Sequence, residues 1–376
     1  AGIDPAVGLY ASFVISIVIA LFGGRPAMIS AAAGSIALVV APLVRDHGVE
    51  YLFAAGLLAG VFQILFGFAR LATLMRYVSN SVRTGFVNAL AILIFAAQLP
   101  HILNAGLAGY AVIAAGLGVI YLAPRVTTAV PAPLICVVLL TAACAGLGVD
   151  VARVADLGAL PDGLPVLHIP DVPLGLDLLG IIFVPALAIA MVGLLESLMT
   201  AGVVDDQTST PSDKNAEARG LGLANVAASL FGGIAGCGMI GQTVSNVKYG
   251  GRGRLSTMAA GGLLLLFMVA AGDLIAQVPV AALVAIMITV SIDTLDWASL
   301  KRLRTTPALS NLVMLATVAV TILSHNLSLG VLVGVLMSGL FFAAKVAAMQ
   351  QVRREGDRYV VEGQIFFASA EAFIEA

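Results

Sequence analysis

The feature that most constrains this chain is a series of twelve apolar runs that contain no Asp, Glu, Lys or Arg. They cover residues 5–24, 26–44, 51–69, 84–100, 102–124, 126–149, 178–195, 220–247, 255–272, 274–292, 308–324 and 326–344. About 20 apolar residues cross a bilayer as a helix, so most runs have the length of one span. With 60% hydrophobic and 11% charged residues, the 376-residue chain has more apolar surface than a water-soluble protein can bury. The sequence therefore predicts an all-α polytopic membrane protein.

The run at 220–247 is too long for one helix and is rich in glycine. It is better explained as a full helix to about residue 235, followed by a short broken element at 238–247. The chain then has thirteen membrane elements.

Lys and Arg are distributed on one side when these elements are threaded alternately across a membrane. Loops near residues 25, 70–83, 125, 205–219, 248–254, 301–304 and 345–358 contain 17 of the 19 basic residues, and only Arg45 and Arg153 lie opposite. The positive-inside rule makes the first set of loops cytoplasmic, together with the C-terminus. We therefore expect a multi-pass protein of the cell inner (plasma) membrane. Residue 1 would lie outside, so one further helix upstream would give fourteen elements.

Two similar segments occupy corresponding places in the chain. "LFGGRPAMISAAAGSIALVV" starts at Leu21, and "LFGGIAGCGMIGQTVSNV" starts at Leu230. Fourteen elements divide into two sevens, and two halves with odd numbers of spans must be inverted relative to each other. The sequence therefore predicts a 7+7 inverted repeat. Glycine-interrupted segments at matching positions are typical of a transporter's binding site.

Three longer stretches resemble a known family: "GLLESLMTAGVVDDQT", "ARGLGLANVAASLFGGIAGCGMIGQTVSNVKYGGRGRLS" and "ALFGGRPAMISAAAGS". Together they are similar to the sulfate permease (SulP) family of anion transporters, over essentially the whole chain. Among bacterial members the resemblance is to C4-dicarboxylate (fumarate) and sodium–bicarbonate transporters, and a fumarate-type symporter is the nearest.

The resemblance implies a fold of the uracil-permease type, in which elements 3 and 10 are short strands joined to half-helices that meet at the midplane. Residues 1–75 and 178–275 would form a core domain, and 76–150 and 276–348 a gate domain. Residues 151–177 would be an extracellular loop. The segment 349–376 would be a linker and the start of a truncated STAS domain. The resemblance also implies a homodimer within the lipid bilayer.

Glu196 is the most informative single residue. It follows fifteen uncharged residues, Ile181 to Leu195. Because an unpaired carboxylate inside a membrane helix is costly, we expect Glu196 to face a cavity and to be protonated for part of the time. A proton that neutralises Glu196 would let a substrate anion bind nearby, so proton binding and anion binding would be coupled. The alternative is a structural role, in which Glu196 lies near a helix end or pairs with a lysine. In sodium-coupled relatives an acid at this position is a cation ligand with a threonine one turn on, which Thr200 matches, so the coupling ion is H+ or Na+.

The two broken elements are the candidate substrate site. The first turn of a half-helix presents free N–H groups and a positive dipole end to an anion. Many animal relatives have an arginine at the position of Gln242, and its absence argues against simple chloride exchange. The alternatives are that these polar residues only satisfy broken backbone and that the small ones only allow tight packing. The candidate substrate-binding residues are Ser30, Ala33, Gly34, Ser35, Ile240, Gly241, Gln242 and Thr243.

Other chemistry is not supported. Gly236-Cys-Gly238-Met-Ile-Gly241 has the spacing of a dinucleotide loop, but it lies in uncharged membrane sequence without a soluble βαβ unit. No nucleophile set or metal spacing indicates an enzyme, no cofactor other than the coupling ion is implied, and the basic residues are a topological band and not a nucleic-acid surface. We interpret His168 as a solvated loop residue, Asp205 as part of a solvated charge run, and Gln98 as an interhelical hydrogen-bond donor. The sequence thus predicts a secondary active transporter of small anions (dicarboxylate, sulfate or bicarbonate) with an elevator mechanism, and an anion channel or prestin-type motor as the alternative.

Overall fold

The computed structural model describes residues 2–73, 78–127, 130–158, 160, 163–173, 175–324, 327–347, 349, 351–355 and 358–362. The chain divides into two compact units, which are treated separately. Unit 1 contains Ala1–Tyr77 and Leu90–Leu295, and unit 2 contains Val78–Ala89 and Asp296–Ala376.

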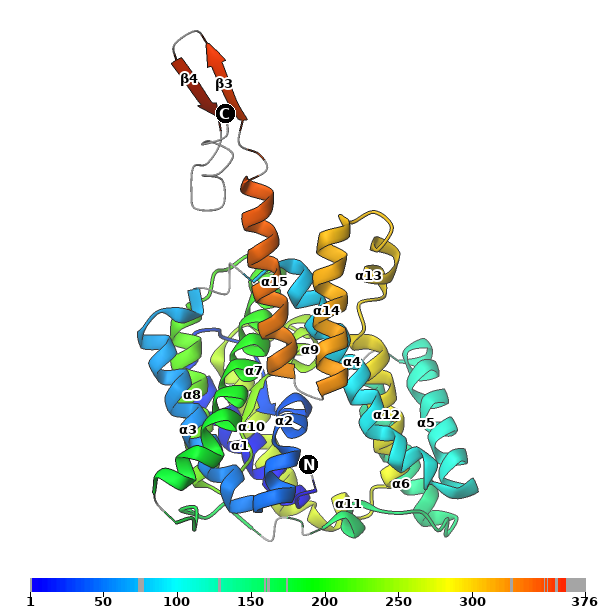
Figure 1. The fold of residues 1–376 in the computed structure, drawn as a ribbon. Helices are drawn as coiled ribbons and strands as arrows, with labels where there is room; N and C mark the ends of the chain where they lie inside the picture. Colours follow the sequence, from blue (N-terminus) through cyan, green and yellow to red (C-terminus); the bar gives the residue numbers. More distant parts are fainter. Residues whose placement is uncertain are drawn as a thin grey trace. The chain divides into compact units, whose positions relative to one another are not determined.

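Unit 1 is built from helices and two very short strands (Figure 1). Its elements are α1 (Pro5–Phe22), β1 (Ser30–Ala32), α2 (Gly34–His47), α3 (Val49–Phe68), α5 (Gly106–Val126), α6 (Ala132–Gly146), the 3-10 helix η2 (Val154–Leu157), α7 (Leu176–Thr208), α8 (Lys214–Leu230), β2 (Gly236–Gly238), α9 (Ile240–Lys248), α10 (Arg254–Ala270), α11 (Gly272–Ala276) and α12 (Val280–Thr294). Helix α4 (Asn80–Leu103) begins in unit 2 and continues in unit 1.

Unit 2 contains the start of α4, α13 (Trp297–Arg302), α14 (Ala308–Ser324), α15 (Leu327–Ala347), β3 (Gln351–Glu355) and β4 (Arg358–Glu362). The strands β3 and β4 pair antiparallel. Most of the predicted STAS start, residues 363–376, lies outside the described residues.

The described helices have the character of a membrane protein. Seven are long and apolar enough to cross a bilayer, namely Pro5–Phe22, Val49–Phe68, Asn80–Leu103, Gly106–Val126, Leu176–Thr208, Val280–Arg302 and Leu329–Val346. Three shorter apolar helices cover Ala132–Gly146, Arg254–Ala270 and Ala308–Ser324. Each predicted apolar run contains a helix of the structure. The largest difference is α7, which continues for twelve residues beyond Glu196 to Thr208 and is followed by Ser209, whose φ of 53° is left-handed.

Small residues bring the helices of unit 1 close together. Helices α3 and α8 lie side by side (Figure 1), and Gly60 faces Gly222 between them. A Cβ atom at Gly60 would lie 2.6 Å from the carbonyl oxygen of Gly222. This is the small-residue packing that lets membrane helices approach at backbone distance. A separate apolar cluster joins α5, α6 and α12 and includes Cys136 and Cys144, both buried.

The two broken elements meet in a two-stranded sheet. Strands β1 and β2 pair antiparallel, with Ser30 opposite Gly238 and Ala32 opposite Gly236. Each "LFGG" segment begins in the last turn of a helix, α1 or α8, and is followed by a strand and then a short helix, α2 or α9. The predicted strand-plus-half-helix elements are therefore present, and their antiparallel pairing is what an inverted arrangement requires.

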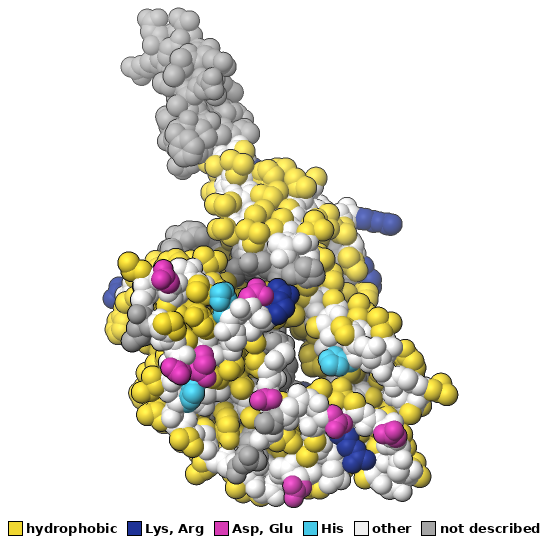
Figure 2. Space-filling model, turned by 60° about the horizontal axis from the view of Figure 1, so that its bottom comes forward, with side chains coloured by type: hydrophobic (Ala, Val, Ile, Leu, Met, Phe, Trp, Pro, Cys, Tyr) yellow, Lys and Arg dark blue, Asp and Glu magenta, His cyan; other side chains and the backbone are white. Residues whose placement is uncertain are grey.

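The loops predicted to share a side do meet. At one end of unit 1, His168 Nε2 lies 2.9 Å from Glu50 Oε2, and the N–H of Val154 donates to the carbonyl of Val278. Figure 2 turns the molecule so that its bottom comes forward, and acidic and basic side chains are both scattered over that face. His168 is a partly exposed loop residue, as the sequence indicates, and the loop after α6 folds back onto α3 and places its imidazole against Glu50.

Two predictions about polar side chains have different outcomes. Gln63 donates to the carbonyl of Ala190 and accepts from Asn225, so it joins three helices. Gln98 instead donates to Ile94 one turn back in its own helix, so its predicted interhelical role is wrong. An amide at the surface of a helix can satisfy the preceding turn when the facing helix offers no acceptor.

Candidate functional site

The candidate site is centred on the first turns of the half-helices α2 and α9. Gly34 and Gly241 lie in these turns, and both are exposed. A Cβ atom built at either glycine meets no heavy atom within 4 Å outside its own turn, so both glycines border open space. Gln242 beside Gly241 is also exposed, whereas Ala33 is buried and Ile240 is half-buried. The first turns therefore offer backbone N–H groups and one amide side chain to a ligand in this space.

Glu196 on α7 contacts the half-helix α2, although the two are far apart in the sequence. Its carboxylate accepts a hydrogen bond from the Ser35 hydroxyl with an Oγ–Oε2 distance of 2.5 Å. The Cys237 thiol is a second hydrogen-bonding neighbour of the same carboxylate. Glu196 is 8% exposed and Ser35 is 2% exposed. The acid predicted to be central is thus bonded to a predicted substrate residue at the start of α2.

Strand β2 is held by side chains of α7. The N–H of Gly238 donates to Ser197 Oγ at 2.8 Å, and Thr200 Oγ1 donates to the carbonyl of Gly238 at 3.0 Å and to that of Glu196. Thr200 lies one turn beyond Glu196, as the sequence indicates, and its hydroxyl is engaged by backbone carbonyls. A membrane-embedded strand needs such partners because no water is available to satisfy its backbone.

Asn225 on α8 is a supporting residue that the sequence reasoning missed. Its side chain accepts from the N–H of Gly236 at 2.8 Å and donates to the carbonyl of Gly236 and to Gln63 Oε1. It is fully buried. An asparagine inside a Gly/Ala-rich membrane helix, eleven residues before the broken strand, is the signal that could have identified it.

Two of the remaining predicted residues are buried, Thr243 in α9 and Ser30 in β1. Thr243 Oγ1 accepts from the N–H of Ile29 at 2.9 Å and donates to the Ile29 carbonyl, so this hydroxyl ties α9 to the segment before β1. Ser30 is fully buried, and its Oγ has no hydrogen-bond partner among the described residues. Among the eight candidates, Gly34, Gly241 and Gln242 are exposed at the open end, while Ser30, Ser35 and Thr243 form the wall behind it.

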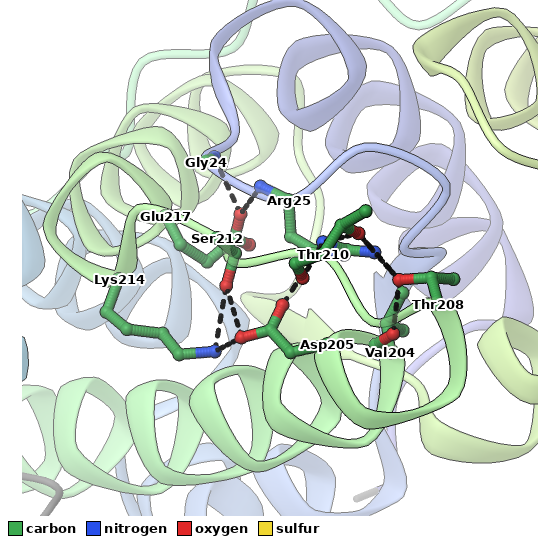
Figure 3. A network of polar contacts seen from close by, with 9 residues as sticks. All are labelled: Gly24, Arg25, Val204, Asp205, Thr208, Thr210, Ser212, Lys214 and Glu217. Carbon is green, nitrogen blue, oxygen red and sulfur yellow. Dashed lines mark hydrogen bonds and ion pairs between the residues drawn. The ribbon is translucent and has the colours of Figure 1, made fainter.

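A polar cluster anchors the segment that leads into β1 (Figure 3). This Arg25 cluster consists of Gly24, Arg25, Asp205, Thr208, Thr210, Ser212, Lys214 and Glu217. Arg25 Nη1 lies 3.2 Å from Asp205 Oδ1, and its guanidinium donates to the hydroxyls of Thr208 and Thr210 at 2.6 and 3.0 Å. The interpretation of Asp205 as a solvated charge was wrong. The extension of α7 carries it into contact with Arg25 and Lys214.

Glu217 completes the cluster from the first turn of α8. It is fully buried, and its Oε2 accepts the N–H groups of Gly24 and Arg25 at 2.8 and 3.0 Å (Figure 3). Arg254 donates to the carbonyls of Ala20, Leu21 and Gly23 at the end of α1. The C-terminal end of α1 and the start of the segment before β1 are thereby fixed to α7, α8 and α10. None of the residues of the Arg25 cluster is a candidate substrate-binding residue, so we assign the cluster a positioning role.

Glu217 gives a testable pH dependence. It lies in the 205–219 segment, which precedes the predicted span of α8. Burial raises its pKa to about 7, although the N–H groups of Arg25 and Gly24 and the charges of Lys214 and Arg254 act in the opposite direction. A raised pKa in the folded state stabilises the protein below the unfolded pKa near 4.5, and this contribution is lost as the pH rises through 7.

We therefore expect wild type to lose stability relative to Glu217→Gln between pH 5 and pH 8, by an amount of the order of 1–3 kcal/mol. The glutamine keeps an oxygen for the two N–H groups and carries no charge. Thermal unfolding of both purified proteins in detergent at four pH values measures the difference. A constant offset across this range would contradict the prediction.

The family model described as "Sulfate permease family" matches residues 1–115 and 110–317, most of the chain. The chain belongs to this family. It is therefore a multi-pass membrane anion transporter and not an enzyme.

Individual relatives of this sulfate permease family member are also named as transporters. YbaR of Bacillus subtilis (strain 168) is 50% identical over 373 residues, which cover 98% of this chain and 78% of YbaR. The bicarbonate transporter BicA of Synechocystis sp. is 30% identical over 374 residues, which cover 91% of this chain and 65% of BicA. In structure, the transmembrane domain of a cyanobacterium bicarbonate transporter BicA is similar with a TM-score of 0.74 at 28% sequence identity, over 89% of each chain.

Proposed function

We propose that this protein is a secondary active transporter that moves a small oxyanion together with a proton. The observation that carries the proposal is the hydrogen bond between Glu196 and Ser35. It connects a buried carboxyl directly to the first turn of a half-helix whose N-terminal glycine faces open space. Proton binding and anion binding at this place affect each other electrostatically.

The sign of the coupling follows from charge. An ionised Glu196 repels an anion that approaches the N–H groups of α2 and α9, and a protonated Glu196 does not. No basic side chain is among the residues that bound the open space in our assignment, so the helix dipoles and the proton must supply the compensation. Loading would therefore take up one proton with each anion. Sodium is the alternative coupling ion, and in that case Glu196 and the backbone carbonyls near Thr200 would be its oxygen ligands.

A coupled carrier is favoured over a channel or voltage-driven motor for the same reason. Gln242 stands where many animal relatives have arginine, so the site has no fixed positive side chain to hold an anion without a coupled cation. A buried acid in contact with the half-helix α2 can bind a proton when the anion binds and release it when the anion leaves.

We infer the moving parts from the repeat. The core domain would comprise residues 1–75 and 178–275, and the gate domain residues 76–150 and 276–348, with the core carrying the β1–β2 site across the membrane. Dense glycine packing of α3 on α8 supports a rigid core. The family resemblance extends the proposal to a 7+7 inverted repeat, a homodimer, a STAS domain and a cytoplasmic C-terminus.

Sulfate and bicarbonate are the first substrates to test, because the family is named for sulfate and BicA for bicarbonate. A dicarboxylate such as fumarate is the third. All three present oxygen atoms to N–H donors and to an amide.

The test is uptake of labelled sulfate, bicarbonate and fumarate into proteoliposomes, with an inward proton gradient, an inward sodium gradient or neither. We expect one anion to accumulate above equilibrium when protons are supplied. Accumulation with a sodium gradient alone would show that sodium, and not the proton, is the coupling ion. Equilibration of all three anions under every condition would show that anion movement is not coupled to either cation and would overturn the proposal.

A further inference from the structure

Unit 2 contains a polar recess that the transport site does not use. It has a volume of about 120 Å³ and lies between the first turn of α4, helix α13 and the first turn of α14. This α4–α14 recess is lined by Asn80, Ser81, Thr84, Ser299, Arg302, Thr306, Ser310, Asn311 and Met314. A single buried water needs only about 15 Å³, so the recess has room for a polyatomic ligand.

The recess is lined by hydroxyl groups that can donate hydrogen bonds to a ligand. The hydroxyls of Ser81, Thr84 and Ser310 have no protein partner among the described residues. Backbone carbonyls nearby are already occupied: that of Arg302 accepts two N–H groups, and those of Leu303 and Thr306 accept from Asn311. No carboxylate lines the recess.

Arg302 supplies a fixed positive charge. One of its terminal nitrogens donates to Asp296 Oδ2 at 2.6 Å, and Asp296 is itself held because its other oxygen caps the N–H of Ser299. The guanidinium is thus oriented and keeps further N–H groups for a ligand. A planar guanidinium with neighbouring hydroxyls is a typical arrangement for binding phosphate oxygens.

The charge of unit 2 points the same way. Among its described side chains, Asp296 is the one acid, against the basic residues Arg83, Lys301, Arg302, Arg304 and Lys345. Exposed apolar side chains lie beside the recess, including Leu300, Leu309 and Leu312. Basic groups next to exposed apolar surface are typical of the cytoplasmic boundary of a bilayer, where anionic headgroups are abundant.

We propose that the α4–α14 recess binds a phosphate group, with Arg302 and the hydroxyls of Ser81, Thr84 and Ser310 as its ligands. The phosphate comes either from an anionic lipid headgroup or from a free phosphate ion. Its occupation bridges α4, α13 and α14 and stabilises unit 2. This site is separate from the transport site, since none of its residues belongs to β1, β2 or the half-helices.

The experiment measures thermal unfolding of the full chain in detergent. One arm adds inorganic phosphate, and the other adds phosphatidylglycerol, with phosphatidylcholine as the neutral comparison. We expect stabilisation of wild type in one arm. Stabilisation by phosphatidylglycerol alone assigns a lipid headgroup, and stabilisation by inorganic phosphate assigns the free ion.

Matched variants locate the effect. Arg302→Gln should weaken the apparent affinity about tenfold or more, because a charge-assisted hydrogen-bond donor is lost. Lys301→Gln removes the same charge from the neighbouring exposed residue and should leave the affinity unchanged. Thr84→Val keeps the charge and removes one hydroxyl, so it tests the recess even if Arg302→Gln does not fold.

A response that persists in Gly241→Trp excludes phosphate binding at the transport site. The proposal is overturned if neither probe stabilises wild type, if the stabilisation is lost in Gly241→Trp, or if Lys301→Gln weakens it as much as Arg302→Gln does.

Discussion

Glu196→Gln is expected to lose gradient-driven accumulation while the protein still folds. The side chain keeps its volume and an oxygen for the Ser35 hydroxyl, but it can no longer gain and lose a proton. Coupling free energies between two sites are typically about 1–3 kcal/mol, or 5–150-fold in affinity. The variant should therefore bind the anion with an affinity that no longer depends on pH, and its uptake should stop at equilibrium.

The measurement compares uptake of the transported anion with and without a proton gradient, and anion affinity at several pH values. Thermal unfolding in detergent checks that the protein is intact. Glu50→Gln is the matched control, because it makes the same chemical change at the carboxylate that contacts His168. Accumulation by Glu196→Gln equal to that of wild type would remove Glu196 from the coupling mechanism.

Ser35→Ala separates the two roles of this contact. It removes the donor to Glu196 but leaves a group that can be protonated. Net uptake should remain coupled, with a changed pH dependence, since the carboxylate loses the hydrogen bond from this hydroxyl. This intermediate behaviour would distinguish a proton site from a merely structural acid.

The elements of the fold could be predicted because they depend on local composition. Each uncharged run contains a helix, and the excess length and glycine content of residues 220–247 predicted the break that separates α8 from α9. The repeated "LFGG" predicted that α1 and α8 are each followed by a broken element. A membrane span is specified by its own residues, so sequence reasoning works well at this level.

The contacts of the site were harder to predict, because they join residues far apart in the chain. Arg25 and Glu217 are separated by 192 positions, and each looks like an ordinary loop charge when read alone. The length of α7 was underestimated because the apolar run ends at its first charge, although the backbone hydrogen bonds continue to Thr208. Thr243 has a hydroxyl that could bind a substrate, but only the structure shows that this hydroxyl is paired with the backbone of Ile29.

Gly241→Trp is the second change with a large expected effect. A Cβ atom at Gly241 meets nothing within 4 Å, so a side chain at this position starts in open space, and we expect an indole to extend into the space before α9. It would cover the N–H groups of the first turn, which we propose as anion donors. Anion binding and uptake should fall to the background of empty liposomes, and the unfolding temperature should stay near that of wild type.

Gly34→Trp and Gly236→Ala distinguish a blocked site from a destabilised fold. Gly34 also faces open space, so its tryptophan variant should abolish uptake from the opposite half-helix with little loss of stability. At Gly236 a Cβ atom would lie 2.1 Å from the backbone oxygen of Ala31, in the strand pair itself. Even alanine should therefore destabilise the protein there, by about 1–3 kcal/mol, as overpacking does. Unaltered anion affinity in both tryptophan variants would place the substrate elsewhere, because two large side chains cannot occupy the ends of α2 and α9 and leave a site between them intact.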